Sequence, residues 1–81
     1  PNICFAGHID VVPPLNENLW YYNPFELKVI GEKVYGRGTV DMKGAIACGI
    51  ASALSYLKIQ PNPKGSISFL LTSDEEGCAK Y

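Results

Sequence analysis

The chain alternates between short apolar runs and turn-forming segments, with one long apolar stretch in its middle. Residues 3–6 are continuously apolar, which is typical of a short strand buried on both faces of an α/β sheet. Residues 66–72 begin with alternation and become fully apolar, so they predict a second strand. Residues 42–59 place apolar side chains at helical spacing. The pattern therefore predicts strand, helix and strand in the order of a βαβ unit.

The predicted helix has no strongly polar side. Its apolar stripe consists of Met42, Ile46, Ile50, Ala53, Leu54 and Leu57. The opposite side carries small side chains, namely Ala45, Ala47, Cys48, Ala51, Ser52 and Ser55. Such a helix is expected to be buried on two sides. Because 81 residues hold little that could cover the second side, we interpret the chain as part of a larger domain.

A loop and a hairpin are predicted between the first strand and the helix. Residues 15–25 are rich in aromatic side chains and asparagine, and we expect Trp20 and Phe25 to fix this loop to the body of the protein. A wall of the substrate site is the alternative interpretation of the loop. Two strands, residues 25–30 and 33–36, then flank a Gly-Glu pair, which indicates a hairpin with a type II′ turn.

Composition and charge exclude several function classes. The net charge of −1 provides no basic surface for nucleic acid or acidic lipid, so we expect neither partner. No apolar run approaches the roughly 20 residues that span a bilayer, and the cytoplasm is the expected location. The cysteines, Cys4, Cys48 and Cys78, are odd in number and lack paired spacing. We expect them to be free and buried as small apolar side chains.

Five of the eight acidic residues fall in three short motifs, which follow predicted strands or precede the helix. They are Asp10, Asp41, Asp74, Glu75 and Glu76, and His8 accompanies the first of them. A solvated surface would scatter acidic residues more evenly. Histidine nitrogen and carboxylate oxygen suit Zn²⁺ and related ions, and one carboxylate can bridge two ions about 3.5–4 Å apart. The pattern therefore predicts a metal site.

The individual roles stay open at this level. His8 and Asp10 are two residues apart, so an extended segment points both side chains the same way, and Asp10 could accept a hydrogen bond from a metal-bound His8. Of the neighbours Glu75 and Glu76, one could bind a metal while the other acts as general base. Taken singly, the motifs have plainer interpretations: a structural histidine, a helix N-cap at Asp41 and a solvated acidic turn. The metal site is favoured because all three plainer interpretations would have to hold together.

The three motifs resemble the dinuclear zinc aminoacylase/carboxypeptidase family. They read Gly7-His8-Ile9-Asp10-Val11-Val12-Pro13, Gly36-Arg37-Gly38-Thr39-Val40-Asp41-Met42-Lys43-Gly44 and Thr72-Ser73-Asp74-Glu75-Glu76-Gly77. The chain departs from the usual family pattern at Ile9, Leu15 and Asn23. The resemblance implies an α/β fold, with residues 1–81 as the N-terminal part of a three-layer zinc-peptidase-like catalytic domain. A mixed sheet, one long helix and a β-hairpin are expected.

The resemblance also implies roles and a reaction. His8 would bind one of two Zn²⁺ or Co²⁺ ions, Asp41 would bridge both, and Glu76 would bind the second. Glu75 would act as general base, and Asp10 would orient His8. The implied reaction converts N-succinyl-LL-2,6-diaminopimelate, a small-molecule N-succinyl amino acid, into succinate and LL-2,6-diaminopimelate, in a homodimeric parent enzyme.

The family also uses a later Glu and a late His as ligands, together with a lid and dimerisation domain. Residues 1–81 contain none of these, so the resemblance predicts that the isolated chain is inactive. A deacylase acting on acetylornithine and a dipeptidase are the nearest alternatives. A non-catalytic remnant that binds a partner is the alternative from another class.

Overall fold

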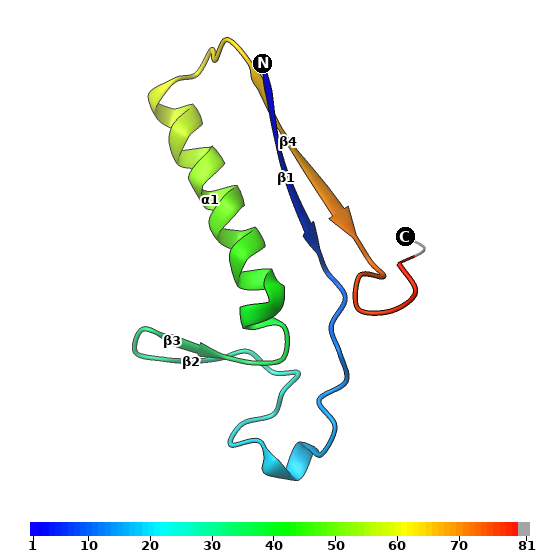
Figure 1. Ribbon diagram of the computed structural model, residues 1–81. Coiled ribbons are helices and arrows are strands. Elements are labelled where there is room, and N and C mark those ends of the chain that lie inside the picture. The colour runs from blue at the N-terminus through cyan, green and yellow to red at the C-terminus, as the bar shows by residue number, and fades with distance from the viewer. Residues whose placement is uncertain (80–81) are drawn as a thin grey trace.

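The computed structural model describes residues 1–79, which form four strands, one long helix and two short helical turns. In chain order the elements are β1 (Asn2–His8), η1 (Glu17–Leu19), β2 (Lys28–Ile30), β3 (Lys33–Tyr35), η2 (Thr39–Lys43), α1 (Gly44–Ile59) and β4 (Ser66–Thr72). Figure 1 shows α1 running beside the paired β1 and β4, with the β2–β3 hairpin below its N-terminal end.

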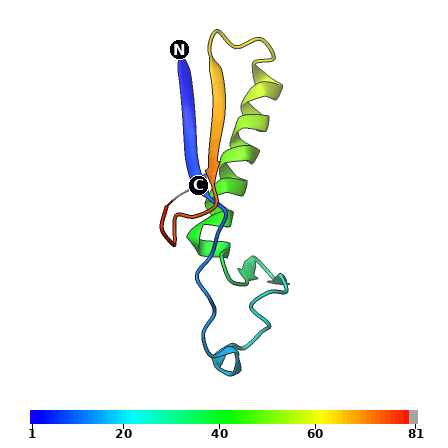
Figure 2. The same ribbon diagram turned by 90° about the vertical axis from the view of Figure 1, so that its right-hand side faces the viewer.

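The strands β1 and β4 pair in parallel, in a register that aligns Asn2 with Ser66 and His8 with Thr72. The helix α1 provides the crossover between them, as the apolar pattern predicted, and the turned view in Figure 2 shows it on one side of the pair. Both strands run in the same direction, so their carboxyl ends lie at the same edge. Any side chain that follows either strand is therefore delivered to one place.

The close approach of β1 to α1 depends on a glycine. A Cβ placed on Gly7 would lie 3.0 Å from Cγ1 of Ile46 and 3.2 Å from Cε of Met42. On the same face, the rings of Phe5 and Phe69 stack with their centroids 5.6 Å apart. Apolar side chains therefore form the contact between the sheet and the helix, and Gly7 lets β1 approach α1 closely.

The hairpin forms where the sequence predicted it, but its first strand is shorter. The strand begins at Lys28 rather than at Phe25, because Asn23 holds the preceding residues in a turn: its side-chain oxygen accepts from the Phe25 N–H at 2.9 Å. At the connection, Gly31 has φ +60°, the left-handed conformation that a type II′ turn requires at its first central position.

The aromatic loop is fixed by one of its two expected anchors. The Trp20 indole N–H donates to the Pro14 carbonyl at 3.2 Å, and the Arg37 guanidinium lies 4.9 Å from the indole ring. These contacts confirm Trp20 as an anchor. Phe25 is 65 % exposed, so its expected role is wrong.

The long helix begins two residues later than the apolar stripe indicates. Residues Thr39–Lys43 form an irregular turn in which Asp41 (φ −126°, ψ 91°) and Met42 (φ −141°, ψ 26°) are not helical, and the peptide bond between them is cis. The residue that precedes α1 is Lys43, and its side chain makes no capping hydrogen bond. Asp41 is therefore not a helix cap.

The expected sheet and the expected burial are both corrected by the structure. Within residues 1–79 there are two separate two-stranded sheets, β1–β4 and β2–β3, rather than one mixed sheet. No apolar side chain in this part of the chain is fully buried, and Cys4, Cys48 and Cys78 are exposed, although they are free as expected. The accessible surface is 6557 Å², against about 4,800 Å² for a compact monomer of this mass. The physical reason is that one helix covers one face of one strand pair, which leaves the other faces of α1, β1 and β4 open.

A substitution at Gly38 is expected to destabilise the segment that carries Asp41. Gly38 has φ +85°, and a Cβ there would lie 2.6 Å from Cγ1 of Val11. We expect Gly38→Ala to lower the free energy of unfolding of the full natural chain by about 1–3 kcal/mol, measured by urea denaturation. Gly31→Ala is the matched control, since Gly31 also has positive φ but a Cβ there would meet no atom within 4 Å. Equal costs at both positions would contradict the steric part of this argument.

Candidate metal centre

The three acidic motifs meet at the carboxyl edge of the β1–β4 pair. His8 is the last residue of β1, and the pairing continues one step further because the Ile9 N–H donates to the Thr72 carbonyl at 2.9 Å. The Glu75–Glu76 turn follows β4, and Asp41 reaches the same place from the turn before α1. The structure thus brings together His8, Asp10, Asp41, Glu75 and Glu76, the five residues that the sequence singled out for the site.

His8 is the centre of the cluster and is only 6 % exposed. Its Nδ1 lies 2.9 Å from the backbone carbonyl oxygen of Asp10. A carbonyl oxygen can only accept, so Nδ1 carries a proton and donates it. In the neutral ring the lone pair is therefore on Nε2, which faces the carboxylates. A histidine whose Nδ1–H is held by a carbonyl, and whose Nε2 points at a carboxylate oxygen 2.9 Å away on Asp41, has the arrangement in which an ion could take the place of a proton between the two groups.

Three carboxylates surround Nε2 of His8. The nearest oxygens are 2.9 Å away on Asp41, 3.6 Å on Glu75 and 4.0 Å on Glu76. Two ligands of one tetrahedral zinc ion, each about 2.0–2.1 Å from it, lie about 3.3 Å apart. The ligand atoms of His8, Glu75 and Glu76 also fall within 4.8 Å of one another. The donor types and their spacing therefore fit a divalent ion such as Zn²⁺ or Co²⁺.

The carboxylate of Asp10 makes a contact that the sequence did not indicate. Its two oxygens accept hydrogen bonds from the backbone N–H groups of Glu75, at 3.2 Å, and Glu76, at 2.8 Å. The same carboxylate is 3.5 Å from Nδ1 of His8, so the shorter contact to the ring comes from the Asp10 backbone. A link over 65 residues of sequence follows only from the parallel pairing of β1 and β4, and no local pattern predicts it.

The surroundings shift the pKa values of three members of the cluster, Glu76, His8 and Asp10. Burial, with the charges of Asp41 and Glu75, raises the pKa of Glu76 above its ordinary value. Burial alone would lower the pKa of His8, but hydrogen bonds to the Asp10 carbonyl and to Asp41 raise it. Burial likewise opposes the shift of Asp10, whose pKa is lowered by the backbone N–H groups of Glu76 and Glu75. A divalent cation at this place would offset the repulsion from Asp41 and Glu75 that contributes to the raised pKa of Glu76.

A cavity of about 580 Å³ lies beside the cluster and is lined by Asp41, Glu76, Trp20 and Arg37, among others. Its walls come from the hairpin, the glycine-rich segment and the aromatic loop. The Arg37 guanidinium lies over Trp20, and its Nε is buried with no acceptor among residues 1–79. Sequence reasoning gave Arg37 no role. Its place between two glycines in the second motif was the available signal.

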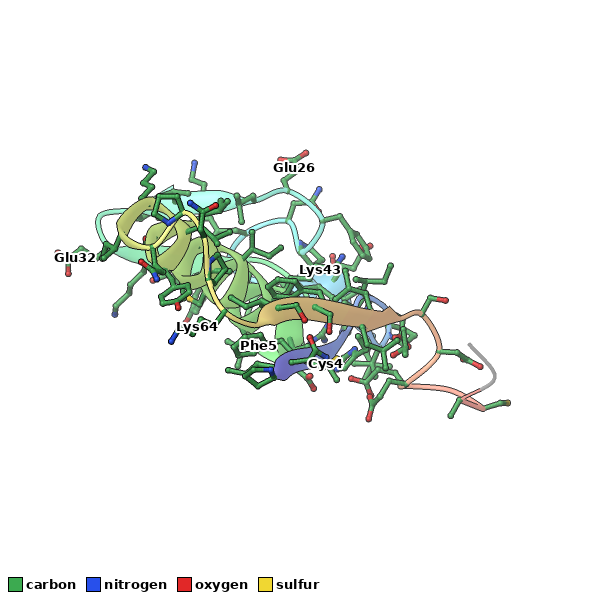
Figure 3. All side chains as sticks on the ribbon, turned by 90° about the horizontal axis from the view of Figure 1, so that it is seen from above. Cys4, Phe5, Glu26, Glu32, Lys43 and Lys64 are labelled. Carbon is green, nitrogen blue, oxygen red and sulfur yellow. The ribbon has the colours of Figure 1, made fainter. Side chains whose placement is uncertain are left out.

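Comparison with known proteins identifies the class. Residues 4–81 match Peptidase family M20/M25/M40, and the chain belongs to this family, whose peptidases are metal-dependent. Figure 3 shows the molecule from above, with the side chains of the described residues around the ribbon.

Within the family, the chain is similar to proteins named succinyl-diaminopimelate desuccinylase. It is 58 % identical to that of Rickettsia prowazekii (strain Madrid E) and 60 % identical to those of Rickettsia felis and Rickettsia bellii, in each case over 100 % of this chain. The chain spans about a fifth of the length of these relatives, 21 % or 22 %. None of the helices in residues 1–79 combines the length and the apolar character that crossing a membrane requires.

Proposed function

We propose that the protein hydrolyses the N-succinyl amide of N-succinyl-LL-2,6-diaminopimelate, giving succinate and LL-2,6-diaminopimelate, with two divalent metal ions. The observation that carries the chemistry is the convergence of Asp41, Glu75 and Glu76 on Nε2 of His8. The choice of substrate rests on the relatives, which are 58–60 % identical to this chain over the whole length of the chain.

The proposed roles follow from how each carboxylate is placed. Asp41 is 71 % exposed at its side chain, lies 2.9 Å from Nε2 of His8 and lines the same cavity as Glu76, which suits a residue that bridges two ions. Glu76 is more enclosed, at 24 %, and its nearest oxygen is 4.0 Å from Nε2 of His8, farther than that of Asp41, so we assign it to the second ion. His8 serves the first ion through Nε2. The bound ions would polarise the amide carbonyl and lower the pKa of water.

Glu75 is the proposed general base. Its side chain is 57 % exposed, and its Oε2 lies 3.6 Å from Nε2 of His8, so it borders the metal position while remaining accessible to a substrate. It would take a proton from the attacking water as the new C–O bond forms. It would then deliver that proton to the amine nitrogen as the C–N bond breaks, and its carboxylate would be regenerated.

The experiment is a substrate comparison. We expect the full natural chain, loaded with Zn²⁺ or Co²⁺, to release succinate from N-succinyl-LL-2,6-diaminopimelate, followed by liquid chromatography of both products. N-Acetylornithine and a dipeptide are the competing substrates, and we expect their kcat/KM to be at least about 100-fold lower, since a site that binds a polar group rejects analogues lacking it. Faster turnover of either competitor would overturn the substrate assignment. No turnover of any of the three, with metal bound, would favour a non-catalytic protein.

A further inference from the structure

The inference concerns Asp10 and the turn that carries the two adjacent glutamates. We propose that the Asp10 carboxylate is a positioning group for the Glu75–Glu76 turn, so that one residue fixes both halves of the metal centre. The proposal deepens the function proposed above and rests on it for its catalytic meaning. Its geometric content, the hold of a carboxylate on two successive backbone amides, stands on the structure alone.

Both oxygens of the Asp10 carboxylate are used on the turn. Oδ1 accepts from the Glu75 N–H at 3.2 Å and Oδ2 from the Glu76 N–H at 2.8 Å. Two neighbouring peptide groups held by one planar carboxylate cannot rotate independently, so the directions of the Glu75 and Glu76 side chains are set together. Bonds from a backbone N–H to an ionised carboxylate are also stronger than those between neutral groups.

The contact of Asp10 with His8 uses a different part of the residue. The ring Nδ1–H donates to the Asp10 backbone carbonyl at 2.9 Å, whereas the nearest carboxylate oxygen is 3.5 Å away. A substitution of the side chain therefore leaves the shorter His8 contact in place and removes the hold on the turn. The backbone of Asp10 aligns the ring, and its side chain aligns the glutamates.

The link has a mechanical basis in the sheet. Asp10 lies two residues beyond β1, and the Ile9 N–H is bonded to the Thr72 carbonyl, which ends β4. The Glu75 and Glu76 amides follow β4 and the Asp10 carboxylate follows β1, and the ends of these two strands are already hydrogen-bonded to each other. Asp10 is 21 % exposed at its side chain, which limits competition from water for the two amides.

The test is amide hydrogen exchange of the metal-free full natural chain. Asparagine offers one acceptor oxygen in place of two, and alanine offers none, so Asp10→Asn and Asp10→Ala form a graded pair. We expect exchange at the Glu75 and Glu76 amides to be at least about tenfold faster in Asp10→Ala, with a smaller change in Asp10→Asn. The amides of α1 should keep their rates, which shows that the variants are folded.

Thr72→Val is the matched control, because it removes only the 3.5 Å hydrogen bond from the Thr72 hydroxyl to the Gly7 carbonyl at the same strand ends. It should leave the Glu75 and Glu76 amides unchanged. As a second readout, Zn²⁺ competition with a chromophoric chelator should show affinity lowered by about 10–100-fold in Asp10→Ala.

The outcomes separate this proposal from the proposed function. Unchanged exchange at both glutamate amides in Asp10→Ala would overturn the positioning role, whatever the activity of the protein. Faster exchange in a protein that does not hydrolyse the succinyl substrate would support the positioning role while the proposed function fails. Equal acceleration in Thr72→Val would also overturn the proposal, because the effect would then belong to the strand ends in general.

Discussion

Glu75→Gln should retain both metal ions and lose at least about 100-fold in kcat. Glutamine keeps the size of the side chain but cannot accept the proton of the attacking water. The substitution leaves His8, Asp41 and Glu76 in place, so the ligands proposed for the metals are intact. The measurements are kcat for succinate release and metal content by elemental analysis of the same preparation.

The control for this variant is Glu32→Gln, which makes the same chemical change at the tip of the hairpin. Glu32 projects away from the paired strands in Figure 3, and its rate should equal that of the unmodified protein. Full activity in Glu75→Gln would remove Glu75 from the role of base. Loss of metal together with activity would instead make Glu75 a ligand, which its 3.6 Å distance from Nε2 of His8 makes a concrete alternative.

Asp41→Ala should bind fewer than two metal ions per chain and lose activity with them. Asp41 has the closest carboxylate oxygen to Nε2 of His8, at 2.9 Å, and it is the proposed bridge. Outer partners of metal ligands already contribute about 10–100-fold to affinity, so the loss of a ligand shared by two ions should exceed about 100-fold. The measurement is metal stoichiometry after dialysis against a defined free Zn²⁺ concentration.

Two variants sharpen the interpretation of this result. Asp41→Asn retains one coordinating oxygen and should bind at least one ion more tightly than Asp41→Ala does. Glu26→Ala, an exposed position on the loop before the hairpin, should retain full metal content. Two ions bound in Asp41→Ala at unchanged affinity would contradict the bridging role.

The order of the elements could be predicted from the sequence, and the reason is local. The alternation that becomes fully apolar gave the bounds of β4, residues 66–72, as the structure has them. The hairpin was indicated by the turn chemistry of Gly31, which has the positive φ that a side chain would resist. These features depend on neighbouring residues, so a single sequence contains them.

Burial and the start of the helix could not be predicted in the same way. An apolar run such as residues 3–6 shows a preference for burial, but what covers a strand is decided by elements distant in sequence. The apolar stripe included Met42 although its backbone is not helical, because side-chain periodicity does not report backbone angles. A cis peptide bond between two residues other than proline, here Asp41 and Met42, has no sequence signature.

The residues of the candidate site were predicted more completely than the hydrogen bonds between them. The clustering of acidic residues with His8 included the five residues that the structure brings together, together with Asp74. The partners within the cluster were not predictable, because they depend on the register of β1 against β4. The hold of Asp10 on two backbone amides and the stacking of Arg37 on Trp20 both follow from tertiary contacts.

The distance along the chain between the two halves of the site has a consequence for protein synthesis. Asp10 and Glu75 are 65 residues apart, and ribosomes add about 5–20 residues per second, so roughly 3–13 s separate their appearance. In the later part of that interval, once residue 41 has been added, the nascent chain contains His8 and Asp41 without the glutamates or the strand that would align them. The synthesis of β4 is therefore the step that brings the glutamates to His8 and Asp41, and the proposed metal site can be completed only after this segment has been translated.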